Sequence, residues 1–139
     1  MSEPVVVGLE PEPLHALAYS SIPTEPFSDR ALSDLLLSAR SWNAQYGVTG
    51  KLVVLERDGD VVQFAQWVEG PRSHLRACVE RIMGDPRHAA FDVRFEGAIA
   101  ARRFPGWDMA FHPADDAAFA GEAKALVGSD APASERPPE

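Results

Sequence analysis

Residues 61–70, VVQFAQWVEG, form the stretch that decides the fold. Successive side chains of a strand point to opposite faces, which places Phe64 and Val68 on one face and Ala65 and Trp67 on the other. Both faces are therefore mainly apolar, a pattern typical of a strand at the centre of a sheet that is covered on both sides. The sequence predicts that the rest of the chain is arranged around this strand.

Gln66 is the polar exception on the face that carries Phe64 and Val68. A buried amide without a hydrogen-bond partner costs about 1 to 3 kcal/mol, so a partner is expected. A neighbouring backbone group could provide it, or a polar side chain from another element. The stretch alone leaves both possibilities open.

The strand at 61–70 has an antiparallel neighbour at 51–56, KLVVLE, across Asp58-Gly59, a dipeptide that favours a tight hairpin turn. Residues 14–20, LHALAYS, are mostly apolar on both faces and predict a second central strand. Residues 91–95 alternate as a half-exposed strand, and 102–111 lead into a last one. The sequence thus predicts five strands.

Two helices separate these strands. Ser28 is a good N-cap, and an apolar stripe runs from there to Tyr46, where Gly47 ends the helix. Pro71 opens the second helix at its first position, and inward-facing apolar residues recur until Gly84. Each helix therefore has one apolar side to place against the sheet.

The order βαββαββ predicts an α+β, ferredoxin-like fold: a five-stranded mixed sheet with two helices on one face, joined by right-handed crossovers. Residues 115–127 add a short C-terminal helix. The Pro, Ser and Glu content of the last dozen residues is typical of disorder. We expect a flexible leader at 1–13, a domain at 14–111, a helical extension at 112–127 and a disordered tail at 128–139.

Composition restricts the class of protein. With 139 residues and 45% hydrophobic content, the chain is long enough for one domain with a core. The formal charge of -8 argues against binding to nucleic acid or to an anionic membrane surface. No apolar run approaches the roughly 20 residues of a membrane-spanning helix. Cys78 is the single cysteine, so no intramolecular disulfide can form, which fits a reducing cytoplasm.

Signatures of common enzymes are missing from the sequence. It has no P-loop, dinucleotide-binding glycine motif or nucleophile elbow, and no His/Cys cluster with zinc-ligand spacing. His74 and Cys78, four residues apart on a helix, could share a metal, but without further ligands Cys78 is better interpreted as core. A small hydrolase on this topology would need an anion-binding loop that we do not find. We therefore expect no enzymatic activity.

Polar and aromatic side chains converge on the helix-covered face. Tyr19 meets Gln66 if the first and third strands are neighbours, as this topology usually has them, and their hydrogen bond would satisfy both. Such a pocket has stacking surface and amide and guanidinium donors, but no acid/base pair, so it suits a flat heteroaromatic ligand. The other candidates are Asn43 near the end of the first helix, Arg87 and His88 after the second, and Trp107 and Met109 on one face of the last strand.

From about residue 14 to 111, the chain resembles the BLUF (blue-light-using flavin) domains. The motifs that carry the resemblance are AYS at 18–20, Asn43 with GVTG at 47–50, QWVEG at 66–70, DPRH at 85–88 and RFPGWDM at 103–109. Each motif is short, but the ordered set is specific. The resemblance implies a blue-light photoreceptor that binds an oxidised flavin, FAD or alternatively FMN or riboflavin, and signals to a separate, unknown partner protein.

The resemblance also implies a role for each residue. Tyr19 would be the redox-active tyrosine, and Gln66 the amide that rotates or tautomerises between it and the flavin after an electron and a proton have left the phenol. The implied flavin contacts are Asn43 and Arg87 at the carbonyl edge, His88 beside the ring and Asp85 near the sugar-like chain, with Trp107 and Met109 as alternating residues that reach or leave the Gln66 side.

Trp42 departs from the family pattern. The family usually has a polar residue at this position, in contact with the ring, so here one flavin contact would become apolar or stacking. The alternative function is a flavin-free ferredoxin-like protein-interaction module, and Trp42 is the feature that favours it.

The opposite face of the sheet carries Ala65 and Trp67 of the central strand. An apolar sheet face needs a cover. We expect it to contact either the C-terminal helix or a second copy of the chain in a homodimer.

Overall fold

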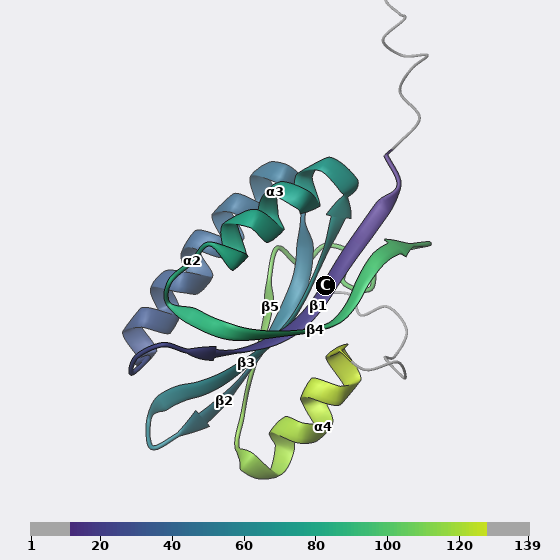
Figure 1. The fold of residues 1–139 in the computed structure, drawn as a ribbon. Helices are drawn as coiled ribbons and strands as arrows, with labels where there is room; N and C mark the ends of the chain where they lie inside the picture. Colours follow the sequence, from purple (N-terminus) through teal and green to yellow (C-terminus); the bar gives the residue numbers. More distant parts are fainter. Residues whose placement is uncertain (1–11, 128–139) are drawn as a thin grey trace, which may run out of the picture.

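A computed structural model describes residues 12–127, and the predicted leader up to residue 11 and the predicted tail at 128–139 lie outside this range (Figure 1). Its sheet has five strands in the order β4-β1-β3-β2-β5, with β2 and β5 parallel and the other pairs antiparallel. The mixed ferredoxin-like sheet is confirmed. The elements are β1 (Leu14–Pro23), α2 (Asp29–Tyr46), β2 (Thr49–Arg57), β3 (Asp60–Pro71), α3 (Arg72–Met83), β4 (His88–Ile99), β5 (Ala110–Ala114) and α4 (Asp116–Val127).

Strand β3 lies at the centre of the sheet, as its two apolar faces predict. It pairs with β1 on one side and with β2 on the other, and every residue from Phe64 to Gly70 is buried. The register sets Tyr19 opposite Gln66 across β1 and β3, so both side chains point to the same face. This pairing places the two predicted switch residues side by side.

Helix α2 begins and ends where its capping residues predict. The Ser28 Oγ accepts a hydrogen bond from the backbone N–H of Ala31 at 3.2 Å. Gly47 closes the helix with φ of 69°, in the left-handed region that glycine enters without a Cβ penalty. Leu32 and Leu36 are buried on its inner side. The predicted cap residues therefore fix the whole length of this helix.

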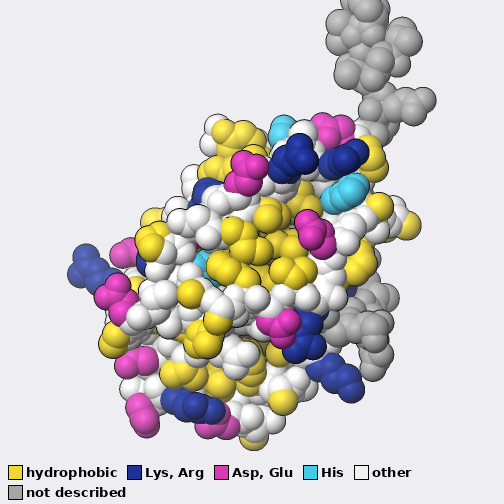
Figure 2. All heavy atoms as spheres, in the orientation of Figure 1, with side chains coloured by type: hydrophobic (Ala, Val, Ile, Leu, Met, Phe, Trp, Pro, Cys, Tyr) yellow, Lys and Arg dark blue, Asp and Glu magenta, His cyan; other side chains and the backbone are white. Residues whose placement is uncertain are grey.

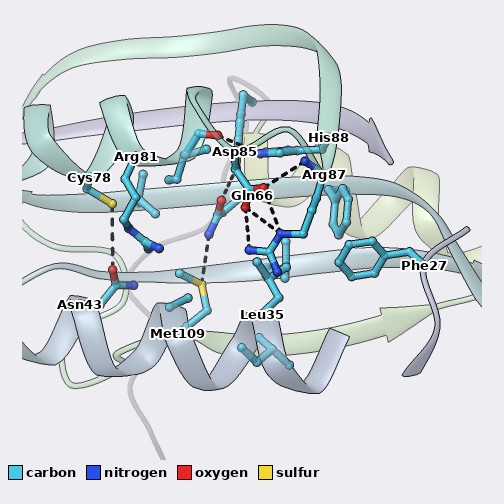
Figure 3. Close-up of a pocket in the computed structure, with 17 residues that line it drawn as sticks. Phe27, Leu35, Asn43, Gln66, Cys78, Arg81, Asp85, Arg87, His88 and Met109 are labelled. Carbon is cyan, nitrogen blue, oxygen red and sulfur yellow. Dashed lines mark hydrogen bonds and ion pairs between the residues drawn. The ribbon is translucent and has the colours of Figure 1, made fainter. Parts of the chain in front are cut away.

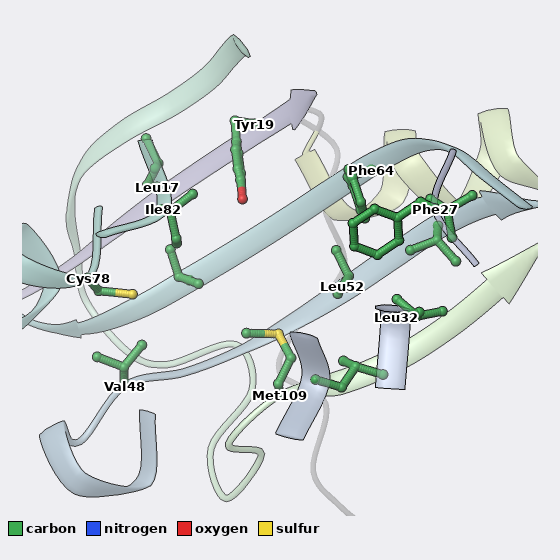
Figure 4. Packing of buried hydrophobic residues seen from close by; sticks show 14 of the residues in the cluster. Leu17, Tyr19, Phe27, Leu32, Val48, Leu52, Phe64, Cys78, Ile82 and Met109 are labelled. Atoms are coloured by element: carbon green, nitrogen blue, oxygen red, sulfur yellow. The ribbon is translucent and has the colours of Figure 1, made fainter. Parts of the chain in front are cut away.

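Two layers cover the sheet. Helices α2 and α3 pack on one face and α4 on the other (Figure 1). The core under α2 and α3 contains Leu17, Tyr19, Leu32, Phe64 and Met109, which converge in Figure 4. Buried side chains thus lie on both sides of β3.

The C-terminal helix is what covers the second face. Phe119 and Leu126 of α4 belong to one buried cluster with Ala65 and Trp67, which are 0% and 6% exposed. Of the two expected covers for these residues, the helix is found. A homodimer through the outer sheet face stays a prediction, since α4 already covers Ala65 and Trp67 within one chain.

Several element bounds differ from those expected. Strand β1 runs on to Pro23, and β4 spans His88–Ile99, because the two strands pair with each other along most of their length. Strand β5 begins only at Ala110, so Trp107 and Met109 precede it and do not share a strand face. Pro71 is the N-cap of α3 rather than its first residue. Pairing partners, which local sequence does not reveal, account for the longer strands.

Glu12 and Pro13, at the end of the predicted leader, are hydrogen-bonded to the start of α3. The Glu12 carboxylate accepts hydrogen bonds from the Ser73 backbone N–H at 2.9 Å and from the Ser73 hydroxyl at 2.8 Å, and the Pro13 carbonyl accepts one from the Arg72 N–H at 3.2 Å. Pro71 has no side chain that could cap α3. Glu12 therefore supplies the missing N-terminal acceptor from outside the helix.

The helices leave part of the first face open. Figure 2 shows apolar side chains gathered in a hollow between α3 and the edge strand β4, with charged side chains around them. Leu17, Leu75 and Val79 contribute to its lining, and Arg72 and Glu96 are among its charged residues. No helix in residues 12–127 is long and apolar enough to cross a membrane.

Candidate functional site

A cavity opens between the sheet and the helices α2 and α3 (Figure 3). Its walls are mostly apolar side chains from β1, β2, β3 and both helices, with a smaller group of polar side chains directed inward. Such a lining suits a small organic ligand that is mainly apolar and has a few hydrogen-bonding atoms. Seven of the predicted site residues line the cavity, namely Tyr19, Asn43, Gln66, Asp85, Arg87, His88 and Met109, and the others include Phe27, Leu35, Leu36, Cys78, Arg81 and Ile82.

Tyr19, Gln66 and Met109 form a chain of contacts on the sheet side of the cavity. The Tyr19 hydroxyl donates a hydrogen bond to the Gln66 Oε1. The Gln66 Nε2 points to the Met109 sulfur at 3.5 Å (Figure 3). The side-chain amide, 8% exposed, therefore has a side-chain partner at both ends, and the expectation of a partner from another element is confirmed.

Tyr19 is held as a neutral phenol. Its side chain is 2% exposed and stacks on Phe91, with ring centroids 5.6 Å apart. Burial raises the pKa of Tyr19 far above its usual value, because a phenolate would lose its hydration. Loss of the hydroxyl proton alone is thus strongly disfavoured, and Gln66 is the group positioned to receive it.

Asn43 fixes the end of α2 to the loop before β5. Its backbone carbonyl accepts from Val48 N–H at 3.0 Å, and its Nδ2 donates to the Asp108 carbonyl at 2.7 Å. The Cys78 thiol lies 4.0 Å from the Asn43 Oδ1, and burial raises the pKa of that thiol to about 11. Cys78 is therefore an unreactive core thiol, as predicted.

Asp85 and Arg87 form an ion pair at the mouth of the cavity. The Arg87 Nη2 lies 2.6 Å from the Asp85 Oδ2, and the Arg87 Nε contacts both carboxylate oxygens. Hydrogen bonding by Arg87 lowers the pKa of the Asp85 carboxyl. A partly exposed pair of this kind can orient a polar extension of a ligand without closing the cavity.

His88 is bound on both ring nitrogens. Its Nε2 lies 3.0 Å from the Ile82 carbonyl, which can only accept, so Nε2 carries the proton and Nδ1 accepts from the Ser21 hydroxyl at 2.8 Å. Burial lowers the pKa of His88, and the nearby Arg87 acts in the same direction while Asp85 opposes it. His88 is therefore a neutral imidazole at the wall of the cavity.

Acidification should destabilise the protein through His88. Because its folded-state pKa lies below 6.5, the unfolded chain binds the proton more readily, and the free energy of unfolding falls as the pH drops from about 6.5 through the folded pKa. Urea unfolding of the wild type and of His88→Gln between pH 5 and pH 8 measures how the free energy of unfolding depends on pH. The wild type should lose stability toward pH 5 more steeply than the variant, and equal slopes would contradict the assignment.

Comparison with known proteins decides the family. A family model described as sensors of blue light using FAD matches residues 14–110. The chain belongs to the BLUF family. Proteins of this family bind a flavin, and the resemblance noted from the sequence motifs is confirmed.

Individual relatives agree with this assignment. The photoactivated adenylate cyclase subunit beta of Euglena longa is 31% identical over 97 residues, which are 69% of this chain and 11% of that protein. The structure of BlrB, a BLUF protein in its dark state, has a TM-score of 0.60 at 30% identity, covering 73% of this chain and 74% of that one. A structure of Klebsiella pneumoniae BlrP1 with FMN and cyclic diGMP has a TM-score of 0.63 at 31% identity, covering 72% of this chain and 26% of that one. The BLUF chain therefore spans about a tenth of the cyclase subunit and about a quarter of BlrP1.

Two donors in the BLUF cavity lack a good acceptor. The Gln66 Nε2 meets only a thioether sulfur, which is a weak acceptor. The Arg81 Nε is buried and has no hydrogen-bond partner among the described residues. The Arg81 side chain points toward the cavity beside Asn43 (Figure 3). A flat ring system with carbonyl oxygens would supply acceptors to both, so the residues present fit a flavin.

The sequence motifs do not point to Arg81. It lies between Cys78 and Ile82 on the inward stripe of α3, where a charged residue next to buried apolar ones is the available signal. Its guanidinium carbon also lies 4.9 Å from the centre of the Trp42 ring, at a distance typical of a cation–π contact. Arg81 thus connects the cavity with the side of α2.

Two predicted site residues lie elsewhere. Trp107 packs in the cluster under α4, on the face opposite to Gln66, while Met109 reaches Gln66. Trp42 is not among the lining residues of the BLUF cavity and packs against Tyr46, with ring centroids 4.4 Å apart and ring planes inclined by 36°. The expectation that Trp107 and Met109 share a face is wrong, because the loop before β5 crosses from one side of the sheet to the other.

His74 and Cys78 do not converge on a metal. His74 Nδ1 lies 2.8 Å from the Tyr46 carbonyl on the surface, whereas Cys78 is buried. Within residues 12–127, no group of three or more His, Cys, Asp or Glu side chains could hold a metal ion. The pair is therefore structural.

Proposed function

We propose that this chain is a blue-light receptor that binds oxidised FAD in the cavity between α2 and α3 and signals through the Tyr19–Gln66 hydrogen bond. That bond, made by two buried side chains at the cavity wall, is the observation that carries the proposal. The two donors without good acceptors, on Gln66 and Arg81, support a ligand with carbonyl oxygens. Asn43 Nδ2 and Arg87 would donate to the carbonyl edge, His88 would lie beside the ring, and Asp85 at the mouth would lie near the sugar-like chain.

When bound, the flavin supplies blue-light absorption and a site that accepts one electron. Tyr19 is the electron donor we propose, because its phenol hydroxyl is hydrogen-bonded to Gln66 in the cavity wall. An oxidised phenol is a strong acid, and its O–H already donates to the Gln66 Oε1, so the proton passes to that oxygen. When the electron returns, Tyr19 regains its proton.

Gln66 keeps its changed amide orientation or tautomer after the electron has returned to Tyr19. Its amide has an acceptor end at Tyr19 and a donor end at Met109. Rotation or tautomerisation exchanges donor and acceptor at both ends, and the new hydrogen bond to the ligand carbonyl would shift the flavin absorption to the red. The altered contact at Met109 would then carry the change from the cavity wall to the loop before β5.

The output is a change of contact rather than a reaction. We propose that the chain acts as a sensor without enzymatic activity of its own and passes the signal to a separate protein. FMN or riboflavin offers the same ring to the cavity, and the Asp85–Arg87 pair at the mouth would contact the parts in which these flavins differ. The buried thiol of Cys78 is compatible with the reducing cytoplasm that we propose as its compartment.

Visible absorption of the purified protein, in the dark and under blue light, tests this function. We expect an oxidised-flavin spectrum that shifts reversibly to the red by several nanometres while the flavin stays oxidised. Extraction of the chromophore and mass analysis then separates FAD from FMN and riboflavin. A colourless protein that also fails to take up added flavin would reject the proposal and favour the flavin-free interaction module.

A further inference from the structure

Glu69 is a charged side chain at the centre of the sheet, three residues after Gln66 on β3. It is 0% exposed. Its Oε1 accepts hydrogen bonds from the Trp67 indole N–H at 2.9 Å and the Arg103 backbone N–H at 2.7 Å. Its Oε2 accepts from the Thr49 hydroxyl at 2.9 Å and the Phe104 backbone N–H at 2.7 Å. A buried carboxylate is stable only with such full pairing, so these four donors are what keeps Glu69 in place.

Two of the four donors belong to residues 102–109, the loop before β5, which is called the segment before β5 below. Charge-assisted hydrogen bonds to backbone N–H groups are short and strong, and here they fix the chain at residues 103 and 104 to the central strand. The Arg102 guanidinium adds contacts to the Thr49 hydroxyl at 2.8 Å and to the Gly47 carbonyl at 2.8 Å. The beginning of the segment is thus anchored on β2 and β3.

The end of the same segment forms part of the cavity. The Trp107 carbonyl accepts from the Gly50 N–H at 3.1 Å, and the Asp108 carbonyl accepts from Asn43. The Arg40 Nε donates to the Met109 carbonyl at 3.1 Å, and the Met109 sulfur reaches Gln66. The position of Met109 therefore depends on how Glu69 holds residues 103 and 104 at the beginning of the segment.

We infer that Glu69 is a positioning residue for the light response: its carboxylate holds residues 103 and 104 so that Met109 lies against the Gln66 amide. This inference rests on the proposed function, because it assigns Glu69 an effect on the Tyr19–Gln66 switch. Glu69 itself shares the sheet face of Trp67, opposite to the cavity, and does not line it. It acts on Gln66 only through the segment and Met109.

The arrangement requires a carboxylate and not merely a polar side chain of the same size. Each oxygen accepts one backbone N–H and one side-chain donor. In Glu69→Gln, one oxygen becomes an NH₂ group, which faces donors and accepts from none of them. One backbone anchor of the segment is then lost, while volume and shape are kept.

The test compares Glu69→Gln with Glu96→Gln, the same change at an exposed position of β4. We expect both variants to bind flavin in the wild-type ratio. In Glu69→Gln, the rate of return from the red-shifted state in the dark should change at least threefold, in the same direction as in Met109→Ala. In a Met109→Ala background, Glu69→Gln should add little, because residues that act through one contact are not additive. The Glu96→Gln rate should stay at the wild-type value.

A second measurement does not depend on light. Amide hydrogen exchange of the peptide covering residues 101–109 should be faster in Glu69→Gln than in the wild type, with the peptides of α2 unchanged. If Glu69→Gln fails to fold, Thr49→Val removes one donor to the carboxylate and should give a smaller effect in the same direction on both readouts.

The outcomes separate the two proposals. A wild type without a light response rejects the proposed function, whatever Glu69 does. A wild type that responds to light, with Glu69→Gln unchanged in dark return and in exchange, overturns the inference. Full additivity with Met109→Ala also overturns it, because the effect of Glu69 would then bypass Met109.

Discussion

Replacing Tyr19 with phenylalanine should abolish the red-shifted state and leave flavin bound. The phenyl ring keeps the stacking on Phe91, but no hydroxyl remains to give an electron and a proton toward Gln66. The Gln66 Oε1 also loses its donor, which should lower the free energy of unfolding by about 1 to 3 kcal/mol. Absorption spectra in the dark and under blue light, with flavin content from denatured protein, measure the first effect, and urea unfolding the second.

Tyr46→Phe is the matched control for this change. Tyr46 lies outside the cavity, packed against Trp42, so its variant should keep a full red shift. A normal light response in Tyr19→Phe would reject Tyr19 as the donor. Loss of flavin from Tyr19→Phe would instead show that the hydroxyl is needed for binding, and the switch would then have to be tested at Gln66.

The largest loss of stability is expected from Phe104→Ala. Phe104 is 2% exposed and packs with Trp67, Ala114 and Phe119 in the cluster under α4. Removing a buried phenyl ring costs about 3 to 5 kcal/mol, since the cavity left behind adds to the lost burial. Global stabilities of small domains are about 5 to 15 kcal/mol, so this single change should bring the chain close to unfolding at 37 °C. Urea denaturation monitored by far-ultraviolet circular dichroism measures the loss.

Phe95→Ala makes the same chemical change on the same side of the sheet. Phe95 is 38% exposed and stacks on Trp67 with ring centroids 5.6 Å apart, so we expect a loss of about 1 kcal/mol. If the two variants were equally stable, Phe104 would not be the centre of this cluster, and α4 would be held by other contacts, such as those of the Arg103 guanidinium to the carbonyls of Ala125 and Leu126.

Much of the fold could be predicted from local sequence. The caps at Ser28 and Gly47 bound α2, and the parity of residues 61–70 separates the face of Gln66 from that of Trp67. These features depend on neighbours in the chain, whose effects periodicity and capping rules describe. The contact between Tyr19 and Gln66 could be predicted because β1 and β3 are neighbours in a ferredoxin-like sheet.

The remaining features depend on contacts between distant residues. The segment before β5 has no periodicity of its own, and its hydrogen bonds to Glu69, Gly50 and Asn43 decide that Trp107 and Met109 lie on opposite sides of the sheet. Trp42 turns away from the cavity because Tyr46 and Arg81 pack against it. A charged residue on a buried strand, as at Glu69, was nevertheless a signal that a cluster of donors had to exist.

Strand order also bears on how quickly the chain folds. The hairpin of β2 and β3 joins consecutive elements, but β1 must find β3 and β4, and β5 must pair in parallel with β2, which places Lys51 beside Ala110. Sheets built from pairings between remote parts of a chain fold slowly, on the order of milliseconds to seconds, because loop closure precedes the gain in contacts. During synthesis, residues up to 71 leave the ribosome before the segment that carries Met109. The tyrosine and glutamine can therefore come together while the part of the chain that completes their surroundings is still being made.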